Sequence, residues 1–259
     1  MSERVHASAI VDKGAELGAD VEVGPYALIG ANVRLGARTT VGPHAVVIGR
    51  TTLGEDNVIF HHASLGAAPQ DLKFHGEPSE LIVGDRNRVR EFATLHLGTE
   101  SGGMTTRVGD DNVLMNYTHV AHDCALGDRN VLANGVQLGG HVTIEDWAVV
   151  GALSGVHQFV RIGESVMIGA GSMVSQDVVP FCTATGDRAR LHGLNVIGLK
   201  RRGVSATSSA AVKRAYKTLF RSGLRLADAL TQIRVDGAAS DEVGRMLRFV
   251  ESSERGLCR

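Results

Sequence analysis

A six-residue repeat constrains the fold of this chain more than any other feature of its sequence. The repeat begins at Val5 and places an aliphatic side chain at every sixth position up to Leu65, and a second unbroken run extends from Val108 to Val174. Between the two runs, three further aliphatic residues keep the same spacing of six: Val83, Val89 and Leu95. A period of six matches neither the 3.6 residues of a helical turn nor the alternation of an ordinary hairpin strand.

The period instead predicts a mainly β solenoid with a triangular cross-section. Each coil would have three faces of six residues, and each face would point one aliphatic side chain toward the axis. Aromatic residues make up only 4% of the chain, whereas glycine contributes 32 residues, which suits a regular, tightly wound backbone. Because successive coils stack about 4.8 Å apart, residues 18 apart in the sequence would lie side by side.

Two segments break the repeat and are predicted to leave the wall as loops. Residues 66–82 carry Asp71 and Glu77 where aliphatic residues are due, and residues 96–107 contain one extra residue and the run Ser101-Gly102-Gly103. Polar loops on a rigid scaffold commonly carry binding sites.

The repeat stops near residue 188, and the rest of the chain is typical of helices. We expect them within residues 191–203, 205–223, 224–235 and 240–256, the last with Ser240 as its N-cap. The sequence therefore predicts two domains, a solenoid over residues 1–188 and an α-helical C-terminal domain over residues 189–259.

Composition narrows the class of protein. The formal net charge is -1, from 27 Lys and Arg against 28 Asp and Glu, so no overall field favours a nucleic-acid partner. The three cysteines include no Cys-x-x-Cys pair, which argues against a disulfide framework or a zinc knuckle. The chain contains no signal-peptide pattern and no run of about 20 apolar residues. We expect a cytoplasmic protein that does not insert into a membrane.

The run HVAHDCALGDRN, residues 119–130, contains the most informative polar cluster. His119 and His122 lie on either side of Val120, whose place in the repeat is inward, so both histidines are expected to face outward. His141 and His157 follow at intervals close to one coil each. A single outward histidine is most often an ordinary solvated residue. Four within about two coils instead indicate the lining of a groove.

Two kinds of chemistry fit this cluster. Zinc-dependent hexapeptide solenoids use a His-x4-His pair, which this chain lacks, so we expect no metal. The alternative is a general base: His122 would take the proton of an attacking hydroxyl, and Asp123 would fix its tautomer. Gly140 on the next coil would bring a backbone N–H to the developing oxyanion. Cys124 has no basic neighbour in the sequence and is not expected to act as a nucleophile.

Several motifs are specific enough to indicate a family. QDLKF (70–74), GEPS (76–79), HVAHDC (119–124), VHQF (156–159), NVIGLKRRG (195–203) and AYKTLFRSG (215–223) closely resemble the bacterial acyl-[acyl-carrier-protein]:UDP-N-acetylglucosamine O-acyltransferases, and the resemblance covers essentially the whole chain. It implies a left-handed parallel β-helix and a homotrimer with active sites between neighbouring solenoids. It also implies cofactor-free transfer of an (R)-3-hydroxyacyl chain from acyl carrier protein to the glucosamine 3-hydroxyl of UDP-N-acetylglucosamine, the first step of lipid A biosynthesis.

The resemblance also implies roles for individual residues. His122 would be the general base, Asp123 its orienting carboxylate and Gly140 the oxyanion donor. Substrate would be bound by a larger set: Asp71, Lys73 and His119 on the sugar, Gln70 and His141 beside them, Gln158, Asn195 and Arg201 on the nucleotide, Arg201 or Arg202 at its phosphates, and His157 in the same block. This chain departs from many members at two positions. Ile197 replaces an acidic residue, and Ala170, with Met173 nearby, occupies the position that limits acyl length, which leaves that length open.

Other interpretations remain open at this point. Asp71 and Lys73 are equally compatible with a surface ion pair, and the basic run from Lys200 to Arg202 with a helix C-terminus. The related UDP-acylglucosamine N-acyltransferases carry an additional N-terminal uridine-binding domain, whereas the repeat here begins at Val5. An acceptor with a 3-amino group would use the same site, and a non-catalytic hexapeptide scaffold is the alternative from another class.

Overall fold

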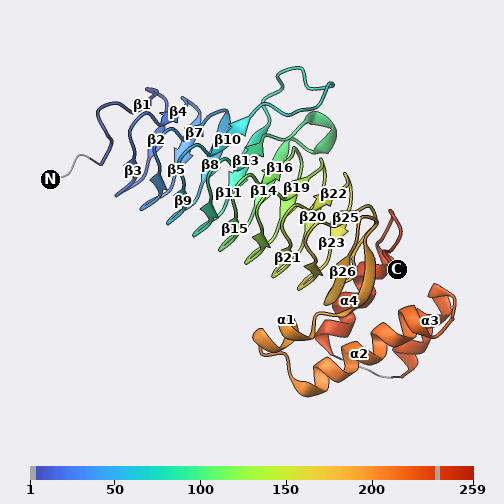
Figure 1. Ribbon diagram of the computed structural model, residues 1–259. Helices are drawn as coiled ribbons and strands as arrows, with labels where there is room; N and C mark the ends of the chain where they lie inside the picture. The colour runs from blue at the N-terminus through green and yellow to red at the C-terminus, as the bar shows by residue number, and fades with distance from the viewer. Residues whose placement is uncertain (1–3, 237–239) are drawn as a thin grey trace.

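The computed structural model describes residues 4–236 and 240–259. The chain winds into a solenoid of short parallel strands, and helices gather at its C-terminal end (Figure 1). Three sheets form the three walls of the solenoid. The first sheet contains β1 (Ile10–Val11), β4 (Leu28–Ile29), β7 (Val46–Val47), β10 (Ser64–Ala67), β13 (Thr94–His96), β16 (His119–Val120), β19 (Gln137–Leu138), β22 (Gly155–Val156) and β25 (Met173–Val174).

The other two walls have the same construction. The second sheet contains β2 (Glu16–Leu17), β5 (Val33–Leu35), β8 (Arg50–Leu53), β11 (Glu80–Val83), β14 (Thr105–Val108), β17 (Ala125–Leu126), β20 (Thr143–Ile144) and β23 (Arg161–Ile162). The third contains β3 (Glu22–Val23), β6 (Thr40–Val41), β9 (Val58–Ile59), β12 (Arg88–Val89), β15 (Val113–Leu114), β18 (Val131–Leu132), β21 (Val149–Val150), β24 (Met167–Ile168), β26 (Cys182–Thr185) and β27 (Arg190–Leu194).

The inward positions of the repeat form the core, as the period predicts. Ile29, Leu65, Leu95, Leu114 and Leu138 are all fully buried along the axis. The strands pair in parallel with partners 18 residues away in regular coils, as Leu28 does with Val46. Apolar burial along this axis is the main source of stability, because each strand is only a few residues long.

Buried asparagines hold one corner of consecutive coils together. The side-chain oxygen of Asn57 accepts the backbone N–H of Asn87, that of Asn87 accepts from Asn112, and that of Asn112 accepts from Asn130. Asn130 continues the series to the N–H of Ala148 at 2.7 Å. Corner N–H groups that the short strands leave unpaired are satisfied in this way.

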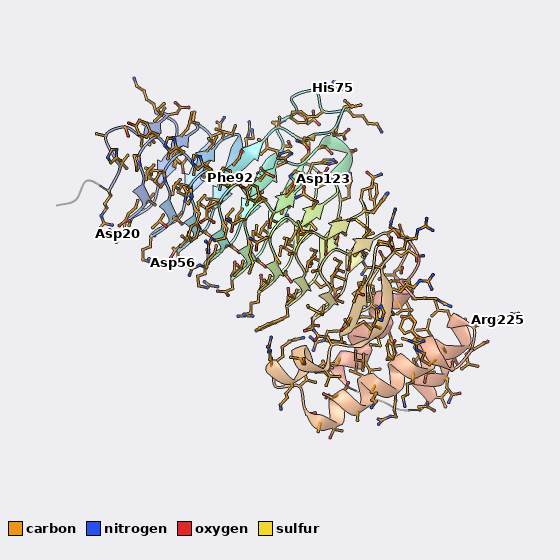
Figure 2. All side chains as sticks on the ribbon, in the orientation of Figure 1. Asp20, Asp56, His75, Phe92, Asp123 and Arg225 are labelled. Carbon is orange, nitrogen blue, oxygen red and sulfur yellow. The ribbon has the colours of Figure 1, made fainter. Side chains whose placement is uncertain are left out.

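Both predicted loops are present, although each is shorter than expected. Residues 68–79 project from the corner between β10 and β11, and a 3₁₀ turn, Glu100–Gly102, projects between β13 and β14 (Figure 1). Residues 66–67 and 80–82 remain in the wall as parts of β10 and β11. The loops lie on the same side of the solenoid, near Asp123 (Figure 2).

The C-terminal region begins with a strand, so the helix predicted over residues 191–203 is wrong in its first part. Arg190–Leu194 forms β27, which pairs antiparallel with β26 at the end of the third sheet. The helices are α1 (Val196–Arg201), α2 (Ala206–Arg221), α3 (Leu226–Val235) and α4 (Asp241–Glu251). The predicted N-cap is confirmed, because the Ser240 hydroxyl accepts the N–H of Val243. No helix within the described residues is both long enough and apolar enough to cross a membrane.

Candidate active site

A groove of about 550 Å³ runs along the outer face of the first sheet. Its floor is a column of residues that pair in register on successive strands: His119 with Gln137, Gln137 with Gly155, and Gly155 with Met173. Each is the first residue of its strand and precedes an inward aliphatic residue, so its side chain points outward. The six-residue repeat therefore builds the groove as directly as it builds the core.

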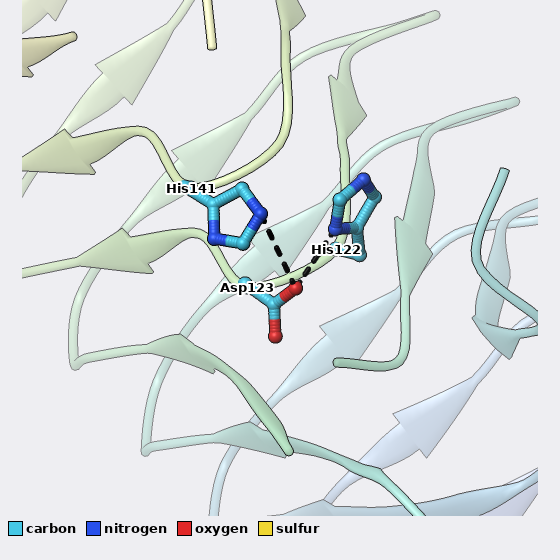
Figure 3. Close-up of side chains that lie close together, drawn as sticks. All are labelled: His122, Asp123 and His141. Atoms are coloured by element: carbon cyan, nitrogen blue, oxygen red, sulfur yellow. Dashed lines mark hydrogen bonds and ion pairs between the residues drawn. The ribbon is translucent and has the colours of Figure 1, made fainter. Parts of the chain in front are cut away.

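His122 and Asp123 form a hydrogen-bonded pair at the edge of this groove (Figure 3). The Nδ1 atom of His122 lies 2.8 Å from Oδ2 of Asp123, whose side chain has no solvent exposure. Because a carboxylate accepts hydrogen bonds, Nδ1 is the donor of this pair, and in the neutral imidazole Nε2 then keeps its lone pair. The arrangement is that of a base held by a carboxylate.

Asp123 lies at a corner of the solenoid, in a left-handed backbone conformation. Asp123 and His141 both have left-handed backbone angles, with φ of 59° and 61°. The side chain of Asp123 is fully buried against the turn that contains Thr99 and Gly102, whereas the side chain of His122 is 14% exposed and lines the groove. Asp123 tolerates this backbone conformation better than most residues do.

Gly140 lies directly against the ring of His122. A β-carbon built on Gly140 would stand 2.6 Å from His122 Nε2, so only glycine fits beside this ring. Within the described residues, the N–H of Gly140 donates to no backbone or side-chain acceptor. A residue that packs against the base and has a backbone N–H free to donate meets the requirements of an oxyanion donor.

His141 packs between the ring of Phe159 and the His122–Asp123 pair. Its ring stacks on Phe159 with the centroids 4.3 Å apart, and it meets the ring of His122 edge-on. Its Nε2 lies 3.8 Å from the Asp123 carboxylate. Burial lowers the pKa of His141, while the carboxylates of Asp123 and Asp71 oppose that change.

His119 is fixed by residues that the sequence did not single out. Its Nδ1 lies 2.7 Å from the hydroxyl of Thr94, and the ring of His96 meets it edge-on at 4.8 Å. Burial, and to a lesser degree the nearby His122, lower the pKa of His119, so the ring stays neutral near pH 7. Thr94 pairs in register with His119, which a correct alignment of coils would have revealed.

The groove also contains Gln70, His157 and Gln158, three of the residues predicted to bind substrate. His157 is held by the C-terminal tail, since Arg255 lies 2.7 Å from its Nδ1. The other loop residues, Asp71 and Lys73, are near the groove without lining it. The backbone N–H of Lys73 donates to Asp71 Oδ1 in a local turn. Among the described residues, no ion pair joins these two side chains.

The residues predicted to bind the nucleotide lie elsewhere in this chain. Asn195 caps helix α1 by accepting the N–H of Gly198, and its amide donates to the carbonyl of Ser165, at the corner between the second and third sheets. Arg202 pairs with the buried Glu164 and donates to the Ser165 hydroxyl. Within one chain, these groups are therefore separated from the groove on the first sheet.

Arg201 and Arg202 differ in what surrounds them. Arg202 is only 17% exposed, and its guanidinium also lies over the ring of Trp147. Arg201, in the last turn of α1, is exposed. The exposed side chain of Arg201 is accessible to a phosphate, whereas the side chain of Arg202 is engaged by Glu164 and Trp147 within the chain. Ile197, at the position that departs from many family members, is 67% exposed on the same helix.

Two other chemistries can be weighed against this geometry. Cys124 is buried, and burial raises the pKa of its thiol to about 12, which suits a structural cysteine rather than a nucleophile. The side chains of His122, Asp123 and His141 approach within 4.8 Å of one another, a set that could hold a metal ion. The expectation of no metal rests on histidine spacing alone, and this set, which includes a carboxylate, lies outside that expectation.

The two residues predicted to limit acyl length lie differently. Met173 lines the far end of the groove and is 49% exposed. Ala170 is exposed outside the groove lining of this chain. Met173 is thus the last residue of the column that begins at His119.

The solenoid and the sequences that match it define the class of protein. Residues 105–140 match the family model described as bacterial transferase hexapeptide (six repeats), and residues 177–258 match the model described as Udp N-acetylglucosamine O-acyltransferase, domain 2. The chain is therefore a hexapeptide-repeat transferase. The chain belongs to the family of acyl-[acyl-carrier-protein]–UDP-N-acetylglucosamine O-acyltransferases, and it is therefore an acyltransferase.

Relatives and solved structures place the chain in this family over its full length. The enzyme of Thiobacillus denitrificans is 53% identical over 255 residues, which cover 98% of this chain and 99% of that protein. The enzyme of a Janthinobacterium species is 51% identical over 259 residues, covering 98% and 99%. The structure of LpxA from Acinetobacter baumannii is 41% identical, with a TM-score of 0.97 over 99% of this chain and 100% of that one. The hexapeptide repeat and the similarity to this structure together fit a left-handed β-helix.

Proposed function

We propose that this protein transfers an (R)-3-hydroxyacyl chain from acyl carrier protein to the glucosamine 3-hydroxyl of UDP-N-acetylglucosamine, the first step of lipid A biosynthesis. The name shared by the relatives supports both substrates. The observation that carries the mechanism is the hydrogen bond from His122 Nδ1 to Asp123, which leaves the opposite ring nitrogen free as a base beside Gly140.

The reaction then needs no covalent intermediate on the protein. His122 Nε2 takes the proton of the 3-hydroxyl while its oxygen attacks the thioester carbonyl carbon, and the carbonyl oxygen gains negative charge near the N–H of Gly140. The carbon–sulfur bond breaks as the carbonyl re-forms. The carrier thiolate leaves and receives the proton held by His122.

The site is completed by neighbouring copies of the chain in a homotrimer. This proposal is supported by the separation within one chain between the groove, with His119, Gln70, His157 and Gln158, and the nucleotide residues Asn195 and Arg201. Asp71 and Lys73 would bind the sugar from the projecting loop. Analytical ultracentrifugation tests the assembly: a trimer is expected, and a monomer that retains full turnover contradicts it.

Product analysis tests the reaction itself. The wild-type protein is incubated with UDP-N-acetylglucosamine and a mixture of hydroxyacyl carrier proteins, and the products are identified by mass spectrometry. We expect ester products with the ordinary sugar and their loss in His122→Ala, with the oligomer intact. Product formed only with a 3-amino sugar would redefine the acceptor. Undiminished turnover by His122→Ala would remove His122 from the mechanism.

A further inference from the structure

The buried carboxylate of Asp123 is held by a residue outside the motif that contains it. Thr99 lies in the second projecting loop, between β13 and β14, and is only 2% exposed. Its backbone N–H lies 2.8 Å from Asp123 Oδ1, and its hydroxyl lies 2.6 Å from Oδ2. Both donors of one threonine are thus directed at the two oxygens of one carboxylate.

These contacts restrict what the carboxylate does. Asp123 Oδ2 accepts from His122 Nδ1 as well as from the Thr99 hydroxyl, and Oδ1 accepts from the Thr99 N–H. Together these three donors fix the plane of the carboxylate. Because the Asp123 side chain has no solvent exposure, water has no access to replace a donor that is removed.

The loop around Thr99 is shaped to keep it in place. A β-carbon on Gly102 would stand 1.9 Å from Cγ of Asp123, so the turn is packed against the carboxylate with no spare room. The carbonyl of Thr99 accepts the N–H of Met104 at 2.8 Å. Glu77, on the loop of residues 68–79, accepts the N–H of Glu100 at 3.2 Å, and this hydrogen bond joins the two projecting loops.

We propose that Thr99 is a positioning residue for the acyl transfer, acting through Asp123 to aim His122 at the groove. The proposal rests on the function proposed above and adds a third member to the His122–Asp123 pair. The hydroxyl of Thr99 sets the orientation of the carboxylate, and the carboxylate in turn sets the direction and tautomer of the imidazole. Substrate binding does not depend on this hydroxyl, because Thr99 does not line the groove.

Three threonine variants separate positioning from a general loss of stability. Thr99→Val removes the hydroxyl and keeps the N–H, Thr99→Ser restores the hydroxyl, and Thr39→Val is the matched control. Thr39 is also fully buried, and its hydroxyl donates to the carbonyl of Gly54 at 2.9 Å, far from the groove. Steady-state kcat, KM for UDP-N-acetylglucosamine and thermal unfolding are measured for each variant.

Thr99→Val is expected to lower kcat by about tenfold or more while KM stays within about twofold. Thr99→Ser is expected to recover most of the activity, and Thr39→Val to lower thermal stability without lowering kcat. Wild-type kcat in Thr99→Val, or an equal loss of kcat in all three variants, would overturn the proposal. His122→Ala distinguishes the two levels: if it retains turnover, the proposed base fails, whereas an inactive His122→Ala beside a fully active Thr99→Val removes only the role of Thr99.

Discussion

Gly140 leaves no room for a side chain beside His122, since its β-carbon would stand 2.5 Å from Cε1 of the imidazole. The mutation Gly140→Ala must therefore displace the ring or the backbone of residue 140. We expect kcat to fall by about 100-fold, as when an oxyanion donor is lost. Gly244→Ala, within helix α4, is the control and should leave kcat unchanged. Unaltered kinetics in Gly140→Ala would show that its N–H and the ring position are not needed.

His96 is predicted to make stability depend on pH. Burial lowers the pKa of this ring to about 4, from an ordinary value of 6.5, and its Nδ1 is buried without a hydrogen-bond partner among the described residues. The unfolded chain therefore binds more protons than the folded one between these two values, and stability falls as the pH falls through this window.

The size of this effect is measurable by denaturant unfolding at a fixed protein concentration. A shift of this size should cost about 2 kcal/mol of unfolding free energy between pH 7 and pH 5. In His96→Gln this contribution should disappear, so the difference between the two proteins should narrow or reverse as the pH falls. Parallel pH dependence in both proteins would contradict the assignment to His96.

Arg201 and Arg202 are adjacent, but replacing them is expected to affect different properties: substrate binding for Arg201 and stability for Arg202. Arg202→Ala leaves the buried Glu164 with Arg245 as its remaining charged partner, which should cost about 2 kcal/mol of stability. Arg201→Ala should change stability by less than about 0.5 kcal/mol, because the side chain is exposed. It should instead raise KM for the sugar nucleotide. Thermal unfolding and steady-state kinetics of both variants test these two expectations. An unchanged KM in Arg201→Ala would exclude a contact between Arg201 and a phosphate.

Met173 is expected to limit the length of the acyl chain. Its Sδ atom would lie 2.9 Å from a β-carbon on Gly155, so the side chain covers the groove floor formed by that glycine. Met173→Ala should open the far end of the groove and shift the products toward longer chains. Competition between hydroxyacyl carrier proteins, read by mass spectrometry, measures the shift. An unchanged product distribution in Met173→Ala, together with a change in Ala170→Met, would assign the limit to Ala170 instead.

The sequence predicted the solenoid well because one simple constraint recurs along it. Residues such as Ile29, Leu65 and Leu138 are buried along the axis, as a period of six requires in a triangular coil. The same phase placed His119 and His122 outward, where the groove is found. The N-cap at Ser240 was predictable for a similar reason, since capping depends on a few adjacent residues.

Thr99 was missed because its partner lies at an irregular distance. Neighbours on regular coils are 18 residues apart, but Leu95 pairs with Val120, so the excursion lengthens this coil to 25 residues. The hydrogen bonds between Thr99 and Asp123 span this longer coil, so the regular spacing of 18 residues does not predict them. Strand β27 was missed for another reason: its pairing with β26 is antiparallel and obeys no six-residue repeat.

That antiparallel pairing also covers the C-terminal edge of the third sheet. A parallel solenoid ends in strand edges that resemble every internal coil, and such edges invite the addition of further strands from other chains. In the third sheet, β27 pairs with the outer edge of β26, and the helices lie at the same end of the solenoid (Figure 1). The C-terminal region therefore has a task that is separate from catalysis, because it terminates a fold that could otherwise be extended indefinitely.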